Sequence, residues 1–114
     1  MEPILLVLTN APDRDAARKL ADGLVSARLA ACVNVLAECT SVYRWKGAIE
    51  TATETPMLIK TRAALFAEVK AFILEHHPYE VPEVIALSVD DVSSAYLEWL
   101  VQQTQPALDA VQRS

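Results

Sequence analysis

The sequence predicts a single α+β domain in which two helices cover one face of an antiparallel sheet. Apolar runs typical of strands recur along the chain, helical periodicity separates them, and a turn at Lys46-Gly47 joins two strands directly. The resulting order is β-α-β-β-α-β with an added C-terminal helix, which is the ferredoxin-like arrangement. A length of 114 residues suits one core, so we expect one domain over residues 1–114.

The first strand and helix are predicted from a change in hydrophobic period. Residues 4–9 form a continuous apolar run, which suits a strand covered on both faces. Asp13 follows a turn and suits the N-cap of a helix that extends to about Arg28. The apolar positions of this helix are Ala17, Leu20, Ala21 and Leu24. A second strand is expected from Ala31 to about Leu36.

Residues 40–61 predict a long hairpin. Its first arm alternates, so that Tyr43 and Trp45 share one face, and its second arm is a threonine-rich strand whose end enters the main sheet. Pro56 lacks an amide hydrogen and is expected at an edge or a bulge. This hairpin is longer than so small a chain can cover, which favours an oligomer. Alternatively, its aromatic side chains pack on the chain's own third helix.

The second half of the chain predicts a helix, a strand and another helix. Thr61 suits the N-cap of the helix, and the helical stripe is Leu65, Val69, Phe72 and His76. Residues 84–89 then predict a buried central strand. The last helix is expected to start between Asp90 and Ser94, and residues 107–114 to form a short helical turn or a frayed end.

Composition excludes several classes of partner. The chain is 53% hydrophobic and 22% charged, as expected of a folded protein, and its net charge is -5. An acidic protein of this kind is expected to bind neither nucleic acid nor anionic membrane, but it is compatible with cations. Residues 4–8 are too few to span a bilayer, and Met1-Glu2-Pro3 lacks the basic start of a secretory signal. With only two cysteines, we expect a reduced, cytoplasmic protein.

The strongest site candidate is the pair His76-His77, which is followed by two prolines, Pro78 and Pro82. Neutral imidazole suits Cu(II), Zn and Ni. Neighbouring residues of a regular helix point about 100° apart, so chelation of one ion requires fraying at Pro78 or symmetry between copies. Alternatively, the histidines cap the C-terminus of the helix, where a positive charge is favoured.

Other reactive residues give weaker indications. Cys32 is either a soft ligand, with Asn34 on the same strand face, or a small core residue. The chain has no Gly-rich phosphate loop, no GxSxG, no HExxH and no CxxC. We therefore expect no catalytic residues and no enzyme activity.

Five collinear segments resemble one known family. They are Ala30-Ala31-Cys32-Val33-Asn34, Ser41-Val42-Tyr43-Arg44-Trp45-Lys46-Gly47, Lys60-Thr61, His77-Pro78-Tyr79-Glu80-Val81-Pro82-Glu83 and Tyr96-Leu97-Glu98-Trp99-Leu100. On these segments the chain is similar to the CutA1 family of divalent-cation tolerance proteins. The resemblance implies a cytoplasmic homotrimer, similar in build to PII signalling proteins, that binds copper ion and contributes to divalent-cation tolerance and the response to copper.

The resemblance also implies candidate site residues. Metal would be bound by His76 and His77, and a further metal site or pocket would use Cys32, Tyr43, Trp45, Lys60, Tyr79, Glu80 and Trp99. Lys60 and Glu80 would either bind a small polar ligand or pair with each other. The alternative is a PII-like trimeric sensor or scaffold that binds a small ligand or partner protein in clefts between subunits.

The chain departs from the family pattern at two positions. Thr9 stands where some members have a cysteine that takes part in copper binding, so this soft ligand is absent. Ala37 stands where a proline is common, and only a local effect on the strand bend is expected.

Overall fold

The predicted order of strands and helices is confirmed in a computed structural model, which describes residues 2–106. The elements are β1 (Ile4–Ala11), α1 (Arg14–Ser26), β2 (Cys32–Val35), β3 (Cys39–Trp45), β4 (Ala48–Arg62), the short 3-10 helix η1 (Ala63–Leu65), α2 (Phe66–His76), β5 (Ile85–Ser88) and α3 (Ser94–Gln103). The predicted tail over residues 107–114 lies outside the described residues.

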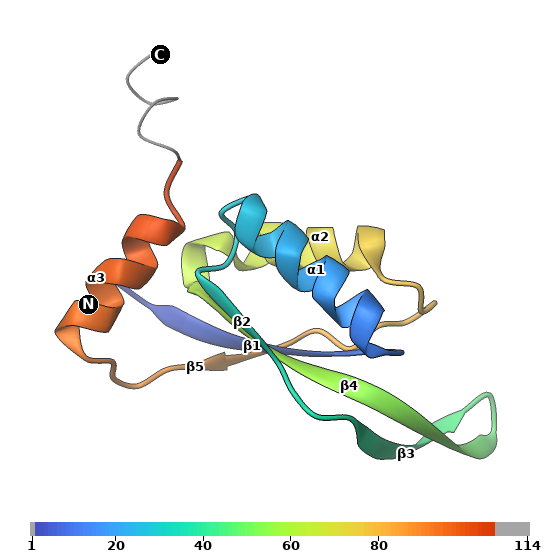
Figure 1. Cartoon of the computed structure of the whole chain (residues 1–114). Helices are drawn as coiled ribbons and strands as arrows, with labels where there is room; N and C mark the ends of the chain where they lie inside the picture. The colour runs from blue at the N-terminus through green and yellow to red at the C-terminus, as the bar shows by residue number, and fades with distance from the viewer. Residues whose placement is uncertain (1, 107–114) are drawn as a thin grey trace.

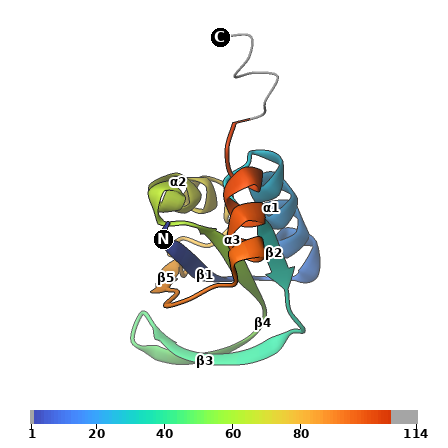
Figure 2. The ribbon, with the colours of Figure 1, turned by 90° about the vertical axis from the view of Figure 1, so that its left-hand side faces the viewer.

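The sheet is antiparallel, with strand order β2-β4-β1-β5. The 15-residue strand β4 continues past the other strands and pairs there with β3 alone. Figure 1 shows α1 and α2 together on one face of the sheet, α3 near the start of β1, and the β3–β4 hairpin projecting at the far end. Figure 2 also separates α3 from the hairpin tip, so the alternative that the hairpin aromatics pack on α3 is wrong for this chain.

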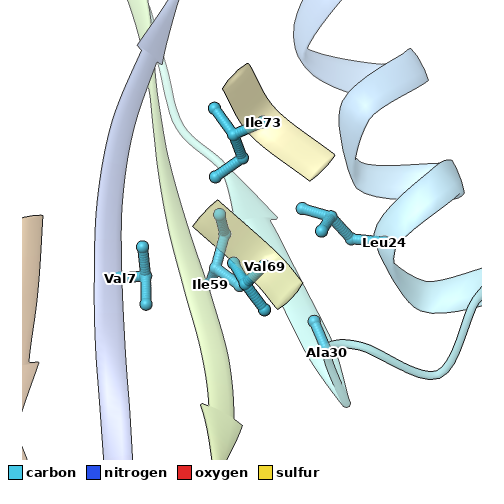
Figure 3. Close-up of a cluster of buried hydrophobic side chains, with 6 residues drawn as sticks. All are labelled: Val7, Leu24, Ala30, Ile59, Val69 and Ile73. Atoms are coloured by element: carbon cyan, nitrogen blue, oxygen red, sulfur yellow. The ribbon is translucent and has the colours of Figure 1, made fainter. Parts of the chain in front are cut away.

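The core lies between the sheet and the two helices (Figure 3). Val7 of β1 and Ile59 of β4 are paired residues on this face, and neither is exposed. They pack with fully buried residues of both helices, including Leu24 and Val69. The expected N-cap of α1 is confirmed, because Asp13 Oδ1 accepts a hydrogen bond of 2.8 Å from the Ala16 amide.

A glycine lets the two helices approach closely. A Cβ atom at Gly23 of α1 would lie 2.5 Å from Cζ of Phe72 on α2. Any larger side chain at Gly23 would therefore displace the Phe72 ring.

The opposite face of the sheet is largely apolar, and α3 covers only its end at Ile4, which packs with Leu100. Side chains alternate along strands, so the register places a second set of residues on the face away from α1 and α2. The apolar members beyond Ile4 are Leu6, Leu8, Leu58, Ile85 and Leu87, which we call the open face. The prediction of a buried central strand at residues 84–89 is wrong, because β5 is an edge strand and all four of its residues are exposed.

Two further expectations concern β4, and one of them is corrected. Thr61 does not cap α2, because β4 continues to Arg62, and the Thr61 hydroxyl instead donates a 2.6 Å hydrogen bond to the Leu29 carbonyl. Pro56 pairs with Asn10 of β1 in continuous register. On its other side the register shifts by one residue between the pairs Val35–Met57 and Cys39–Glu54, so the predicted bulge at Pro56 is confirmed there. Its carbonyl oxygen accepts a hydrogen bond from the Leu36 amide just beyond the end of β2. The proline nitrogen, which has no hydrogen to donate, lies on the same side, at the interruption between β2 and β3.

The predicted stripe of the second helix is displaced by part of a turn. Val69 and Ile73 are its buried residues, whereas Phe72 is half-buried and His76 is exposed. The helix begins only at Phe66, after η1, and its buried pair Val69 and Ile73 follows the i, i+4 spacing of one helical face.

Candidate functional site

His77 joins the loop after α2 to the end of β1. Its side chain is buried, Nε2 lies 2.6 Å from the Asn10 carbonyl oxygen, and Nδ1 accepts a 3.1 Å hydrogen bond from the Tyr79 amide. A nitrogen that accepts from an amide carries no proton, and one that faces a carbonyl must donate, so the geometry assigns the Nε2–H tautomer. Both ring nitrogens therefore have partners.

His76 lies in a different environment. Its exposed ring stacks on Phe72, with ring centroids 4.1 Å apart, and Nδ1 lies 2.9 Å from the Phe72 carbonyl oxygen. Facing that carbonyl, Nδ1 must donate its proton, which leaves Nε2 as an available lone pair. The ring lines a cleft of about 360 Å³ together with Asp13, Asp15 and Lys19.

The donors of this cleft fit a divalent ion that is intermediate between hard and soft in its choice of ligands. Imidazole nitrogen and carboxylate oxygen are both ligands that Cu(II) and Zn accept. Within residues 2–106, however, no three His, Cys, Asp or Glu side chains are grouped closely enough to hold a metal ion. Cys32 is not among the residues that line this cleft; it lies half-buried on the same sheet face as Lys60, its partner in β4.

A larger depression lies between the β3–β4 hairpin and residues 78–83, and we call it the hairpin groove. Its volume is about 860 Å³. Three aromatic and three acidic residues line it, namely Tyr43, Trp45, Tyr79, Glu54, Glu80 and Glu83.

The hairpin groove brings together four of the residues predicted for a pocket, Tyr43, Trp45, Tyr79 and Glu80. Lys60 and Trp99 do not line it. Both instead lie near Tyr96 of α3, with the Lys60 ammonium 5.9 Å and the Trp99 ring 5.4 Å from the Tyr96 ring.

Glu80 pairs with a lysine other than the one considered from the sequence. Its carboxylate lies 4.0 Å from Lys46 Nζ, at the turn of the hairpin. In the described residues no ion pair joins it to Lys60.

Sequence reasoning missed Glu54, although a signal for it was present. In the hairpin register Tyr43 pairs with Glu50 and Cys39 pairs with Glu54, so every second residue of β4 shares the face of Tyr43 and Trp45. Alternation therefore predicts Glu54 on the aromatic face. Glu83 was included in the family match only as the last residue of a segment, and its approach to Asn10, at 3.5 Å, depends on the path of the loop.

Glu54 and Tyr79 interact across the hairpin groove. Burial of the Tyr79 phenol and its hydrogen bond to the Glu54 carboxylate raise the pKa of Tyr79 to about 12. The phenol therefore stays protonated and can donate to Glu54 throughout the physiological range. The His77 contacts tie the start of the loop to the end of β1.

Comparison with known proteins identifies consistent relatives. A family model described as "CutA1 divalent ion tolerance protein" matches residues 5–103. Protein CutA of Homo sapiens is 43% identical over 100 residues, which cover 88% of this chain and 56% of that protein. The divalent-cation tolerance protein CutA of Pyrococcus horikoshii is 42% identical over 102 residues, which cover 90% of this chain and 99% of that protein. The chain thus spans little more than half of the human relative.

Solved structures give the same result. CutA1 from Oryza sativa superposes with a TM-score of 0.89 at 38% identity, covering 93% of this chain and 97% of that one. The CutA1 protein from Thermus thermophilus superposes with a TM-score of 0.86 at 39% identity, covering 90% and 99%.

Proposed function

This chain belongs to the CutA1 divalent ion tolerance family, and from that premise we propose that it binds a divalent metal ion, copper first, and contributes to divalent-cation tolerance and the response to copper. The family description names tolerance of divalent ions and no reaction. We accordingly propose a binding protein without catalytic residues.

The observation that carries this proposal is the free Nε2 of His76 in a cleft with two carboxylates. The His76 ring is held by Phe72, and Asp13 and Asp15 line the same cleft. Cu(II) binds such N and O donors most tightly of the common divalent metals. Because three donors do not converge within the described chain, water or a second copy would complete the ligand set.

His77 takes a different part in this proposal. It can bind a metal only by giving up its hydrogen bond to Asn10 or to Tyr79. We therefore propose His76 as the principal ligand and His77 as a second ligand that requires rearrangement of the loop.

The open face supports a homotrimer as the working form. Ile85 and Leu87 are 47% and 48% exposed, and they lie beside Leu6, Leu8 and Leu58. Contiguous exposed apolar surface of this kind typically marks a protein interface. Other copies of the chain would cover it.

A cytoplasmic location is likewise proposed. None of the described helices is long and apolar enough to cross a membrane. Relatives are described as chloroplastic in Arabidopsis thaliana and periplasmic in Archaeoglobus fulgidus, so location differs among them.

A second candidate function is a PII-like sensor or scaffold, and the hairpin groove favours it. The groove has a volume typical of sites for small molecules and is separate from the His76 cleft in all lining residues except Pro78. A ligand bound there would depend on the aromatic and acidic residues of the hairpin rather than on His76.

The metal proposal is tested by calorimetric titration of Cu(II) and Zn(II) in the presence of a competing chelator. We expect His76→Ala to weaken Cu(II) binding by at least about tenfold, since one ligand is lost. His77→Ala, measured separately, should have the smaller effect.

Asp15→Asn tests the cleft carboxylate, and Asp22→Asn, on the exposed surface of α1, is its matched control. Unchanged Cu(II) affinity in His76→Ala would refute the assignment, and light scattering on the same samples would report the oligomer.

A further inference from the structure

We propose that the hairpin groove is a binding site for an organic cation, in which Glu54 is the charge partner of an ammonium or guanidinium group and the rings of Tyr43, Trp45 and Tyr79 surround it. This inference deepens the second candidate function and does not depend on the metal site at His76.

The first argument is the burial of Glu54 without a cation. Its side chain lines the hairpin groove, and the residue is only 8% exposed. Among residues 2–106, no lysine, arginine or histidine nitrogen lies within 4.0 Å of its carboxylate. Tyr79 gives it a hydrogen bond but no positive charge. Burial of a carboxylate without a counter-charge is unfavourable, so a cation that enters the groove gains a strong electrostatic interaction.

The second argument is the aromatic lining. The faces of tyrosine and tryptophan rings carry negative electrostatic potential and attract cations, most strongly when water is excluded. The aromatic rings of Tyr43, Trp45 and Tyr79 line the groove together with Glu80 and Glu83. This combination is suited to an amine or a guanidinium and unsuited to an anion.

The third argument distinguishes an organic cation from a metal ion. The acidic residues of the groove are too far apart to form a group of three metal donors, since no such group is present in the described part of the chain. A volume of about 860 Å³ also far exceeds a single ion and falls in the range of small-molecule sites.

Lys46 illustrates the proposed contact at the rim. Its ammonium lies 5.7 Å from the centre of the Trp45 ring and 4.0 Å from Glu80 Oε2. The Lys46 side chain is 74% exposed, so this pair is weak and easily displaced. A ligand that places its cation deeper, beside Glu54, would meet a more buried carboxylate than Lys46 does.

The experiment uses Trp45 as the reporter. Trp99 is the only other tryptophan and lies on α3, so the full-length Trp99→Phe protein leaves a single tryptophan in the groove. Its fluorescence is titrated with putrescine and with arginine amide at constant ionic strength. The neutral analogue 1,4-butanediol is the matched probe for putrescine. We expect a saturable change with the two cations and none with the diol.

Charge-neutralising variants then locate the binding. Glu54→Gln should weaken cation binding at least about tenfold, because a charge-assisted contact in a buried site is lost. Glu75→Gln, which removes an exposed carboxylate of α2 that does not line the groove, should leave it unchanged. Lys46→Met should strengthen binding, since the competing ammonium is removed. Circular dichroism of each variant would confirm that it folds.

Light scattering in the same samples separates two sources of the cation. In one case, a lysine or arginine of a second copy fills the hairpin groove. Free amines then bind only weakly, and Glu54→Gln lowers the oligomer mass. This result would assign the cation to another chain. Two results together would overturn the proposal. The fluorescence would respond equally to putrescine and butanediol, and Glu54→Gln and Glu75→Gln would not differ in binding or in oligomer mass. His76→Ala should retain cation binding, so failure here is distinct from failure of the metal site.

Discussion

The two faces of the sheet are made from the same apolar strands but differ in what covers them. On one face Val7 and Ile59 lie beneath α1 and α2 and are fully buried. On the other face, neighbours along the same strands, Leu6 and Leu58, are only half-buried, and Leu87 of β5 is 48% exposed. The first face contains most of the buried core of the chain. Beyond Ile4, which lies beneath α3, the second face has the composition of a core but lacks a covering layer in the single chain, which is expected of a surface that meets other copies.

The largest expected effect is on the covered face. Ile59→Ala should lower the free energy of unfolding by about 2–5 kcal/mol, because it removes buried methyl groups and leaves a cavity. Urea denaturation at several protein concentrations would measure it. Leu58→Ala, at the next position and on the open face, is the control, and its cost should grow with protein concentration as assembly covers that face. Equal, concentration-independent costs would erase the distinction between the faces.

A smaller effect is expected on the open face, where it concerns assembly rather than folding. Leu87→Asp should reduce the molecular mass measured by light scattering towards the 12.5 kDa of one chain, while the circular dichroism spectrum is retained. The physical reason is that an ionised carboxylate cannot be buried in an apolar interface without a partner. Leu74→Asp, on the exposed surface of α2, makes the same chemical change elsewhere and should leave the mass unaltered. A Leu87→Asp protein that assembles like the wild type would show that the open face is no interface.

The smallest effect is a pair of opposite changes within the covered face. Thr61→Val should destabilise the protein by about 1 kcal/mol, because the hydroxyl that donates to the Leu29 carbonyl is lost. Thr9→Val should stabilise it by about 1 kcal/mol, because Thr9 Oγ1 is buried without a hydrogen-bond partner in the described structure. Denaturation midpoints would measure both. Two changes of the same sign would mean that the Thr9 hydroxyl has a partner in solution, such as a buried water.

The sequence predicted those features that depend on local periodicity and spacing. The order of elements, the Asp13 cap and the long hairpin all follow from such patterns and are confirmed. The apolar run at residues 84–89 could not reveal its exposure, because an apolar edge strand has the same composition as a buried central strand. The error at Thr61 has a similar origin, since a threonine that suits a cap equally suits a strand.

The candidate sites show the same limit. Spacing along the chain grouped Tyr43, Trp45, Tyr79 and Glu80 correctly, but it also included Lys60 and Trp99, which lie at the other end of the sheet. Sequence also could not show that the adjacent histidines have different partners. That difference arises because the chain leaves the helix after His76, so that the His77 ring turns towards β1.

The double role of β4 has a consequence for the order in which the chain folds. Its first half pairs with β3 across a two-residue turn, whereas its second half pairs with β1, about fifty residues away in sequence. Hairpins close within about 1–10 μs, while distant strands must first overcome the entropy of a long loop. We therefore expect the β3–β4 hairpin to form early and to present the rest of β4 as a template on which β1 and β2 dock. The segment that projects furthest from the core would then be where folding of the core begins.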